Sequence, residues 1–236
     1  MKLVARQRPG ARDLALENQL FVRRVTSQLA VAGIRQFLVI GAGAITNPTV
    51  HLALQEVEPT GRVVYVSDNR MVLALGRSLS HADCRRPGGG VCVNYAYADP
   101  REPESILSAP QVRALDLTEP VALFLVAGLH LVPDSQDPHG LIDQLVKALA
   151  PGSYLAVSHL TLDYPSPAVD AAMRLYERSG IPARPRSRTE VEQFFERVQL
   201  LDPGVGLVSQ WRRSPEDGPV TTPEQIACLA GVGRLE

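Results

Sequence analysis

Hydrophobic positions in the first quarter of the chain change from helical to strand-like spacing. From Ala11 to Ala32 apolar residues recur at three- and four-residue intervals, which predicts an amphipathic helix. Gln36 to Ile40 is a short apolar run, Gly41-Ala42-Gly43 follows it, and Thr49 to Val57 resumes a helical pattern. This order predicts a strand, a glycine turn and a helix, which together form one half of a nucleotide-binding unit.

The same alternation continues through the middle of the chain. Short runs rich in apolar and β-branched residues predict strands over Arg62–Val66, Val91–Tyr97, Val121–Val126 and Ser153–Ser158. The intervening segments predict helices over Arg70–Ser80, Glu102–Leu107 and Leu141–Leu149. The run from Val121 to Val126 is wholly apolar, which is typical of strands buried on both faces of a parallel sheet. Five βα units therefore predict a doubly wound α/β sheet.

The last third of the chain predicts a helical cover and a sheet edge. Pro167 to Ser179 has a helical pattern, and Ser187-Arg188-Thr189-Glu190 is a capping box that opens a helix ending near Val198. Gln199 to Leu201 and Gly206 to Arg212 predict an antiparallel hairpin. We expect one domain with a mostly parallel seven-stranded sheet, divided into an N-terminal helical segment (1–32), a Rossmann-like core (33–160), a helical lid (161–198) and an edge hairpin with a tail (199–236).

Composition narrows the classes of ligand and compartment. The 236 residues suffice for one sizeable core, and 24 basic against 25 acidic residues give no electrostatic reason to expect nucleic acid or a membrane. A small molecule is the expected ligand, and a homo-oligomer is compatible with the sequence. The three cysteines have no metal-type spacing, so no metal site is expected. Without a signal-like start or a membrane-length apolar run, we expect a cytoplasmic protein.

Three features predict a ligand site at the carboxyl ends of the first three strands. Gly41 and Gly43 permit a ligand to approach the backbone and the following helix, although two glycines in a turn also suit a purely steric role. A nucleotide site usually adds a carboxylate after the second strand, where Asp68 is the candidate. Asp99, after the third strand, either faces the same crevice or caps the turn before Pro100.

Two histidines follow neighbouring predicted strands. His130 comes after the fourth strand and His159 after the fifth, so both imidazoles are expected at the crevice, where they would act as acid and base. The alternative is that both are structural histidines that donate to loop carbonyls. Tyr164 and Tyr176 belong to the predicted lid and are candidates for the substrate pocket, with ordinary packing as the alternative.

Several stretches together resemble a known family. These stretches are Ala32–Leu38, Arg62–Val66, Ala98–Pro103, Val126–His130, Leu149–Leu155, Phe194–Phe195, Pro203–Gly204 and Gln210–Arg212. With them the chain is similar to the actinobacterial S-adenosylmethionine-dependent methyltransferases once catalogued as a domain of unknown function. The resemblance covers nearly the whole chain, and it implies a class I methyltransferase fold with an S-adenosylmethionine site.

The chain departs from this family pattern on the cofactor side. Where the family resembles D-I-G-x-G in the first strand, this chain has Val39 in place of the acid. Ser67 stands where the family's second strand has the acid that holds the ribose, and nothing before Ala11 matches the family's Y-D-Y-L-L-G-G-K-x-N-F segment. Each lost polar contact is worth about 1–3 kcal/mol, so the resemblance implies a weakened cofactor site.

Three functions fit these observations. The first is a methyltransferase-fold enzyme of specialised metabolism that no longer transfers methyl groups, needs no cofactor, and cyclises or isomerises a small molecule with His130 or His159. The alternative is an active S-adenosylmethionine-dependent methyltransferase of small molecules, with Asp68 substituting for the lost acid. A non-catalytic partner or metabolite-binding protein is the third. The surviving Asp99 and the two histidines favour the first interpretation.

Overall fold

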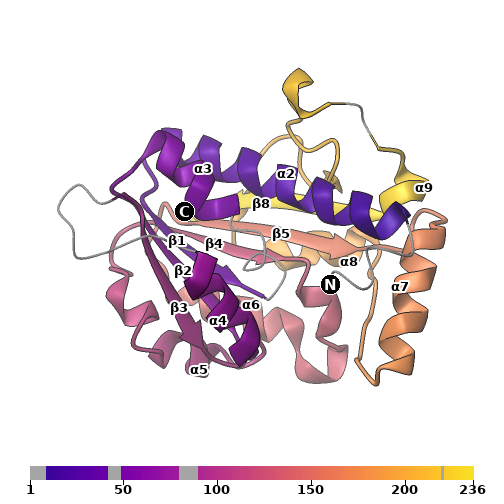
Figure 1. Cartoon of the computed structure of the whole chain (residues 1–236), viewed down its shortest axis with the longest axis horizontal. Coiled ribbons are helices and arrows are strands. Elements are labelled where there is room, and N and C mark those ends of the chain that lie inside the picture. Colours follow the sequence, from indigo (N-terminus) through magenta and orange to yellow (C-terminus); the bar gives the residue numbers. More distant parts are fainter. Residues whose placement is uncertain (1–8, 42–48, 80–89, 219–220) are drawn as a thin grey trace.

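The strands of the protein form one twisted sheet, seen edge-on between helices in Figure 1. The computed structural model describes residues 9–41, 49–79, 90–218 and 221–236. Within this part the sheet has eight strands in the order β3-β2-β1-β4-β5-β8-β6, with β7 paired to β8. The parallel strands are β1 (Gln36–Ile40), β2 (Arg62–Ser67), β3 (Cys92–Tyr97), β4 (Val121–Val126) and β5 (Tyr154–Leu160). The antiparallel strands are β6 (Gln199–Leu200), β7 (Gly206–Leu207) and β8 (Cys228–Arg234).

Helices cover both faces of the sheet. One face packs against α2 (Pro9–Val31), α3 (Thr49–Val57) and α4 (Arg70–Leu79), and the other against α5 (Pro103–Ser108), α6 (Pro138–Lys147) and α8 (Arg188–Glu192). α7 (Pro167–Arg178) and α9 (Pro223–Ile226) contact each other and α2. Short 3₁₀ turns complete the chain at Val112–Ala114 (η2), Leu129–Leu131 (η3), Asp134–Gln136 (η4), Gln193–Phe195 (η5) and Pro215–Asp217 (η6).

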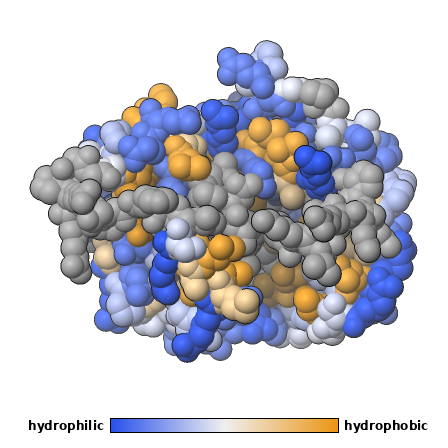
Figure 2. All heavy atoms as spheres, viewed as in Figure 1, coloured by the Kyte–Doolittle hydropathy of each residue, from blue (hydrophilic) through white to orange (hydrophobic). Residues whose placement is uncertain are grey.

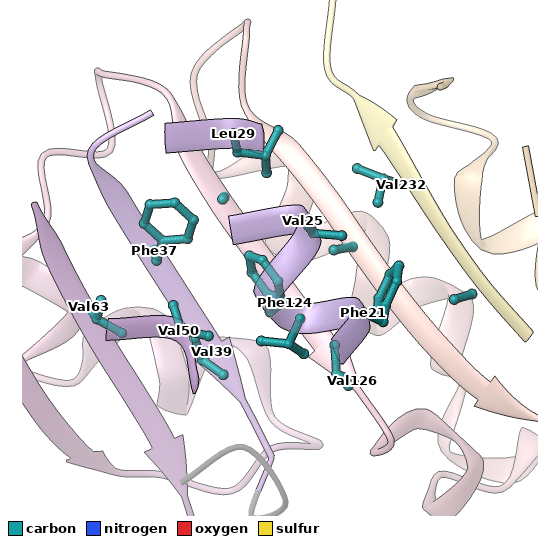
Figure 3. Packing of buried hydrophobic residues seen from close by; sticks show 14 of the residues in the cluster. Phe21, Val25, Leu29, Phe37, Val39, Val50, Val63, Phe124, Val126 and Val232 are labelled. Carbon is teal, nitrogen blue, oxygen red and sulfur yellow. The ribbon is translucent and has the colours of Figure 1, made fainter. Parts of the chain in front are cut away.

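Alternation along β1 shows how the apolar runs build two cores. Phe37 and Val39 point into the cluster beneath α2 and α3, whereas Leu38 and Ile40 point into the cluster beneath α5 and α6. Successive side chains of a strand face opposite sides, so a strand covered on both faces must be apolar throughout. Figure 3 shows the first cluster, where residues of α2 lie over the central strands and Phe37 and Phe124 lie 5.9 Å apart between ring centroids.

The predicted βα units and the antiparallel C-terminal part of the sheet are confirmed, but the strand pairing predicted for that part is wrong. The residues expected to form a hairpin make only the two-residue strands β6 and β7, and both pair with β8 instead of with each other. β8 lies beside β5, in a segment that the sequence assigns to a tail. The sheet consequently has eight strands in place of seven. Trp211, within the predicted second strand of the hairpin, is 1% exposed and lies in a turn.

Close packing explains why β8 has an unusual sequence for a buried strand. A Cβ atom added at Gly233 would stand 2.3 Å from Cγ2 of Val198, and one at Gly231 would stand 3.0 Å from Cζ of Phe195. The segment after α8 therefore approaches the backbone of β8 directly. Glycine permits this approach and also has a low strand propensity, which removes the β-branched pattern from the sequence.

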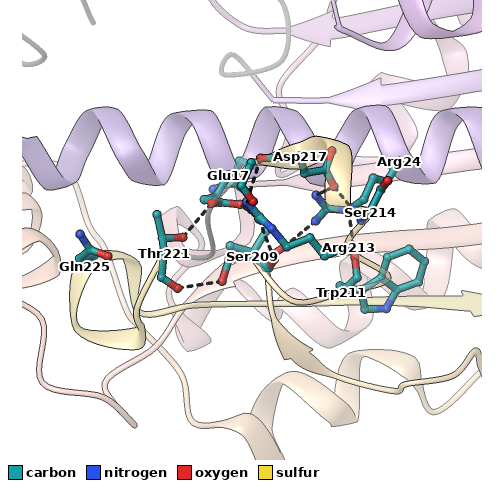
Figure 4. Close-up of polar contacts among 12 residues, drawn as sticks. Glu17, Arg24, Ser209, Trp211, Arg213, Ser214, Asp217, Thr221 and Gln225 are labelled. Atoms are coloured by element: carbon teal, nitrogen blue, oxygen red, sulfur yellow. Dashed lines mark hydrogen bonds and ion pairs between the residues drawn. The ribbon is translucent and has the colours of Figure 1, made fainter.

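Buried ion pairs attach α2 to the C-terminal segment between β7 and α9. Arg213 donates to Glu17 at 2.9 Å, and Arg24 donates to Asp217 at 2.9 Å (Figure 4). Glu17 also accepts a hydrogen bond of 2.8 Å from the Thr221 hydroxyl. This segment therefore depends on α2 for its position. Across the described ranges, each helix is either too short or too polar to span a membrane.

Candidate functional site

The sheet changes direction between β1 and β4. β2 and β3 lie on one side of β1 and β4 lies on the other, so the strand order reverses at this point. Open α/β sheets bind their ligands in the crevice outside the carboxyl ends of the strands at such a switch point. The candidate site is therefore built from the residues that directly follow β1 to β5.

Glycines keep the floor of this site bare, which means that no side chain lies between the ends of β1 and β4. Gly41 directly follows β1, has a φ of +119° and donates its N–H to the carbonyl of Val66 at 3.1 Å. This backbone conformation is strained for other residues. Gly128 follows β4, and a Cβ atom there would stand 4.0 Å from the carbonyl oxygen of Ile40. The two strand ends thus meet without a side chain between them. Gly43, predicted from the sequence as a cofactor-binding residue, lies outside the described residues.

Two carboxylates and two arginines lie at the ends of β2 and β3. Asp99 accepts three hydrogen bonds from Arg101: from Nε at 2.8 Å, from Nη2 at 2.6 Å and from the backbone N–H at 2.9 Å. These contacts hold the pKa of Asp99 below its usual range. Hydrogen bonding to Asp99 raises the pKa of Arg101, and exposed Asp68 adds a smaller contribution through its charge. The guanidinium of Arg70 lies 4.5 Å above the ring centroid of Tyr97.

Val39 and Ser67 are both wholly enclosed. Val39 is 1% exposed and belongs to the cluster of Figure 3, and Ser67 is fully buried at the end of β2. The hydroxyl of Ser67 accepts the backbone N–H of Asn69 at 3.1 Å, which shapes the turn after the strand. In the described part of this edge, Asp68 and Asp99 are the carboxylates nearest to the ends of β2 and β3.

His159 lies next to His130, as the strand order requires, but it is enclosed in the sheet. β5 runs two residues further than expected, so His159 is part of the strand and is 0% exposed. Its Nδ1 lies 2.7 Å from the carbonyl of Leu160, and its Nε2 lies 3.0 Å from Nη1 of Arg186. A carbonyl only accepts and a guanidinium only donates, so the proton is on Nδ1 and the ring is neutral. Burial lowers the pKa of His159 to about 4.

His130 is buried without these contacts. It lies in η3, is 3% exposed, and its ring centroid is 5.9 Å from that of His159 and 6.0 Å from that of Tyr176. Neither ring nitrogen has a hydrogen-bond partner in the described part of the chain. Burial, assisted by His159 and Arg186, lowers the pKa of His130 to about 3. Tyr176 on α7 and Tyr164 before α7 are both half-buried and pack against the core.

Sequence reasoning missed the arginines that surround the histidines. Arg186 is 2% exposed and donates to the carbonyls of Leu129 and Val132 and to Asp134. Arg184 forms ion pairs with Asp134 and Glu190. Both arginines come from a proline-rich segment that reads as an exposed loop. The only signal was the placement of two arginines between the predicted lid and the capping box.

A doubly wound sheet with a glycine turn after β1 and an antiparallel C-terminal strand beside β5 is the fold of the class I methyltransferases. The family model of S-adenosyl methyltransferases matches residues 1–236, and the chain belongs to this family. A comparison with curated proteins finds no match.

Two solved structures are similar over the full length of the chain. A DUF574 family protein from Streptomyces avermitilis is 36% identical, with a TM-score of 0.87, and the match covers 100% of this chain and 88% of that one. A putative methyltransferase from Thermobifida fusca is 34% identical, with a TM-score of 0.83 and coverage of 100% and 86%. The N-methyltransferase NodS from Bradyrhizobium japonicum, solved with S-adenosyl-L-homocysteine, is 16% identical with a TM-score of 0.50 and coverage of 97% and 89%, and shares the fold.

Proposed function

We propose that this chain is an S-adenosylmethionine-dependent methyltransferase that acts on a small molecule. The observation that carries the proposal is the bare floor between Gly41 and Gly128 at the switch point of the sheet. A nucleoside-containing cofactor needs close access to the backbone at this place. Membership in the family supports the same function, and it replaces the expectation that no cofactor is needed.

The residues at the strand ends fit this cofactor in part. Gly41 admits the backbone approach, exposed Asp68 is available to ribose hydroxyls, and Asp99 holds a carboxylate at the end of β3. Apolar surface also lies nearby, since Tyr97 is 53% exposed and Met71 is 82% exposed. When bound, the cofactor would supply the methyl group. The uncharged Val39 and Ser67 predict weaker binding than in relatives that have acids there.

The acceptor would lie on the other side of the switch point, toward His130. A neutral imidazole presents one donor and one acceptor nitrogen, which suits a hydroxyl or an amine. His130 is enclosed by Tyr176 of α7, so we propose that α7 covers the acceptor and that Tyr176 and Tyr164 shape its pocket. The role of His130 is to orient the acceptor, while His159 packs against His130 and supports its ring.

A cofactor-independent cyclisation or isomerisation is the second candidate. Its specific support is the pair of uncharged, enclosed positions Val39 and Ser67 on the cofactor side. The family comparison agrees better with methyl transfer, and fold alone does not determine the reaction.

Calorimetric titration of the wild-type protein with S-adenosylmethionine separates the two candidates. We expect saturable binding at one site, with S-adenosyl-L-homocysteine competing. A titration without heat or competition at millimolar cofactor would overturn the proposed methyl transfer and favour the second candidate.

Replacing Asp68 by asparagine tests which residue now holds the ribose. We expect Asp68→Asn to weaken cofactor binding roughly tenfold, because it removes a charge-assisted hydrogen bond of about 1–3 kcal/mol. The matched control is Asp143→Asn on α6, where the carboxylate pairs with exposed Arg197 away from the strand ends. Equal affinities for both variants would show that Asp68 has no part in binding.

A further inference from the structure

The interior of the protein holds a buried charge that the proposed function does not use. The face in Figure 2 carries several apolar patches separated by hydrophilic side chains, and none of them is accompanied by a feature that identifies an occupant. The interior is more informative. Arg186 is a fully buried cation beside two buried histidines, and the proposed function leaves it without a role.

We propose that Arg186 is the positioning residue of the acceptor side: it donates to Nε2 of His159, which keeps that ring neutral, and it holds the turn that carries His130. This proposal rests on the proposed function, because it assigns His130 to the acceptor. Arg186 itself does not touch the acceptor in this account. It acts through the two histidines and through the backbone of η3.

The hydrogen bonds of Arg186 connect the segments that carry His130 and His159. Nη1 donates to the carbonyl of Leu129 at 3.2 Å and lies 3.0 Å from Nε2 of His159. Nη2 donates to the carbonyl of Val132 at 2.9 Å and to Asp134 at 2.7 Å. The Arg186 backbone N–H donates to the carbonyl of Leu160 at 3.1 Å. One side chain thereby joins the end of β5 to both ends of the η3 turn.

The same loop holds His130 from a second point. The backbone N–H of Arg184 donates to the carbonyl of His130 at 2.7 Å, and the Arg184 side chain pairs with Asp134 and Glu190. His130 is therefore held through its backbone on both sides. Its ring is left to contact the rings of His159 and Tyr176.

The charges around the histidines favour neutral rings. Arg186 is in direct contact with His159, and Arg184 lies on the same loop. The facing carboxylates are Asp134 after η3 and Glu190 on α8, and each is already paired with an arginine. Tyr176 faces His130 from α7 with an uncharged ring. A guanidinium donor at Nε2 is incompatible with an imidazolium, so Arg186 keeps His159 neutral, and the Leu160 carbonyl at Nδ1 places the single proton there.

Long-range proton–nitrogen NMR of the histidine rings tests this role without any ligand. In the wild-type protein we expect His159 with a protonated Nδ1 and a bare Nε2, and no protonation of His130 or His159 at pH 6. In Arg186→Met we expect His159 to titrate at least about one pH unit higher, while the Leu160 carbonyl keeps the neutral ring in its Nδ1–H form. Arg186→Lys, which keeps a donor and the charge, should restore the low titration of His159 in part.

Arg197→Met is the matched control, because Arg197 pairs with Asp143 on the surface and should leave the ring signals unchanged. Unchanged His159 ring nitrogens in Arg186→Met would overturn the proposal. So would a wild-type His159 protonated on Nε2 or doubly protonated at pH 6, a result that does not depend on whether the variant folds. Failure of cofactor binding would leave these signals as expected, so the two proposals fail separately.

Discussion

Lowering the pH from 7 to 5 is expected to reduce the free energy of unfolding by about 4 kcal/mol, because two buried histidines resist protonation. The pKa values of His130 and His159 are lowered to about 3 and about 4 from 6.5. The unfolded chain therefore binds more protons than the folded one below pH 6.5. Stability is fully present above this pH and is lost as the pH falls toward the folded-state values. Denaturant unfolding at a series of pH values measures the slope.

The matched variants are His130→Asn and His159→Asn, each of which removes one titrating ring. Each is expected to remove about half of the pH-dependent loss, or about 2 kcal/mol between pH 7 and 5, whatever its effect on stability at neutral pH. Buried His51, whose pKa is also lowered, adds a further loss in the same direction. A wild-type stability that is flat over this range would contradict the burial of both rings.

Removal of the Glu17 carboxylate should have the second large effect. Glu17 is 2% exposed and pairs with Arg213, which is itself 10% exposed, inside the network of Figure 4. Glu17→Ala leaves Arg24 paired with the carboxylate of Asp217, whereas Arg213 keeps only hydrogen bonds to the backbone carbonyls of Ser209, Asp217 and Gly218 among its described contacts. Breaking a buried ion pair on one side costs about 3–5 kcal/mol, so the melting temperature should fall steeply. Thermal and denaturant unfolding both measure this change.

An exposed ion pair between α2 and α3 provides the control for Glu17→Ala. Arg23 on α2 and Glu56 on α3 are 3.6 Å apart and more than half exposed. Glu56→Ala should cost at most about 1 kcal/mol. If the two variants lose similar stability, the network between α2 and the C-terminal segment does not hold the fold as described.

Apolar periodicity predicts the parallel part of the fold well. The predicted bounds of α3 and β4 agree with the structure at both ends, because a strand or helix covered on its buried faces must carry its apolar residues at fixed spacing. β8 escapes this reasoning. Its buried positions are filled by glycine and alanine beside cysteine, leucine and valine, and the need for glycine comes from Phe195 and Val198, which reach β8 only in the folded sheet.

The candidate site could be predicted in position but not in environment. Strand order places His130 beside His159 because neighbouring parallel strands end at one edge. The environment of His159 includes Arg186, which reaches it from 27 residues further along the chain. No local pattern marks an arginine in a proline-rich segment as buried. The same limit applies to Asp99, whose pairing with Arg101 is a matter of side-chain direction and not of spacing.

We infer that the cofactor of this family binds at the carboxyl ends of β1 to β4. Hydrogen–deuterium exchange with and without S-adenosyl-L-homocysteine measures where it binds. We expect added protection in peptides that cover Gly41, the turn at Asp68, the turn at Asp99 and the segment 126–130, with no change in β6 to β8. Protection confined to other segments, or no added protection at saturating ligand, would contradict binding of the cofactor at these strand ends.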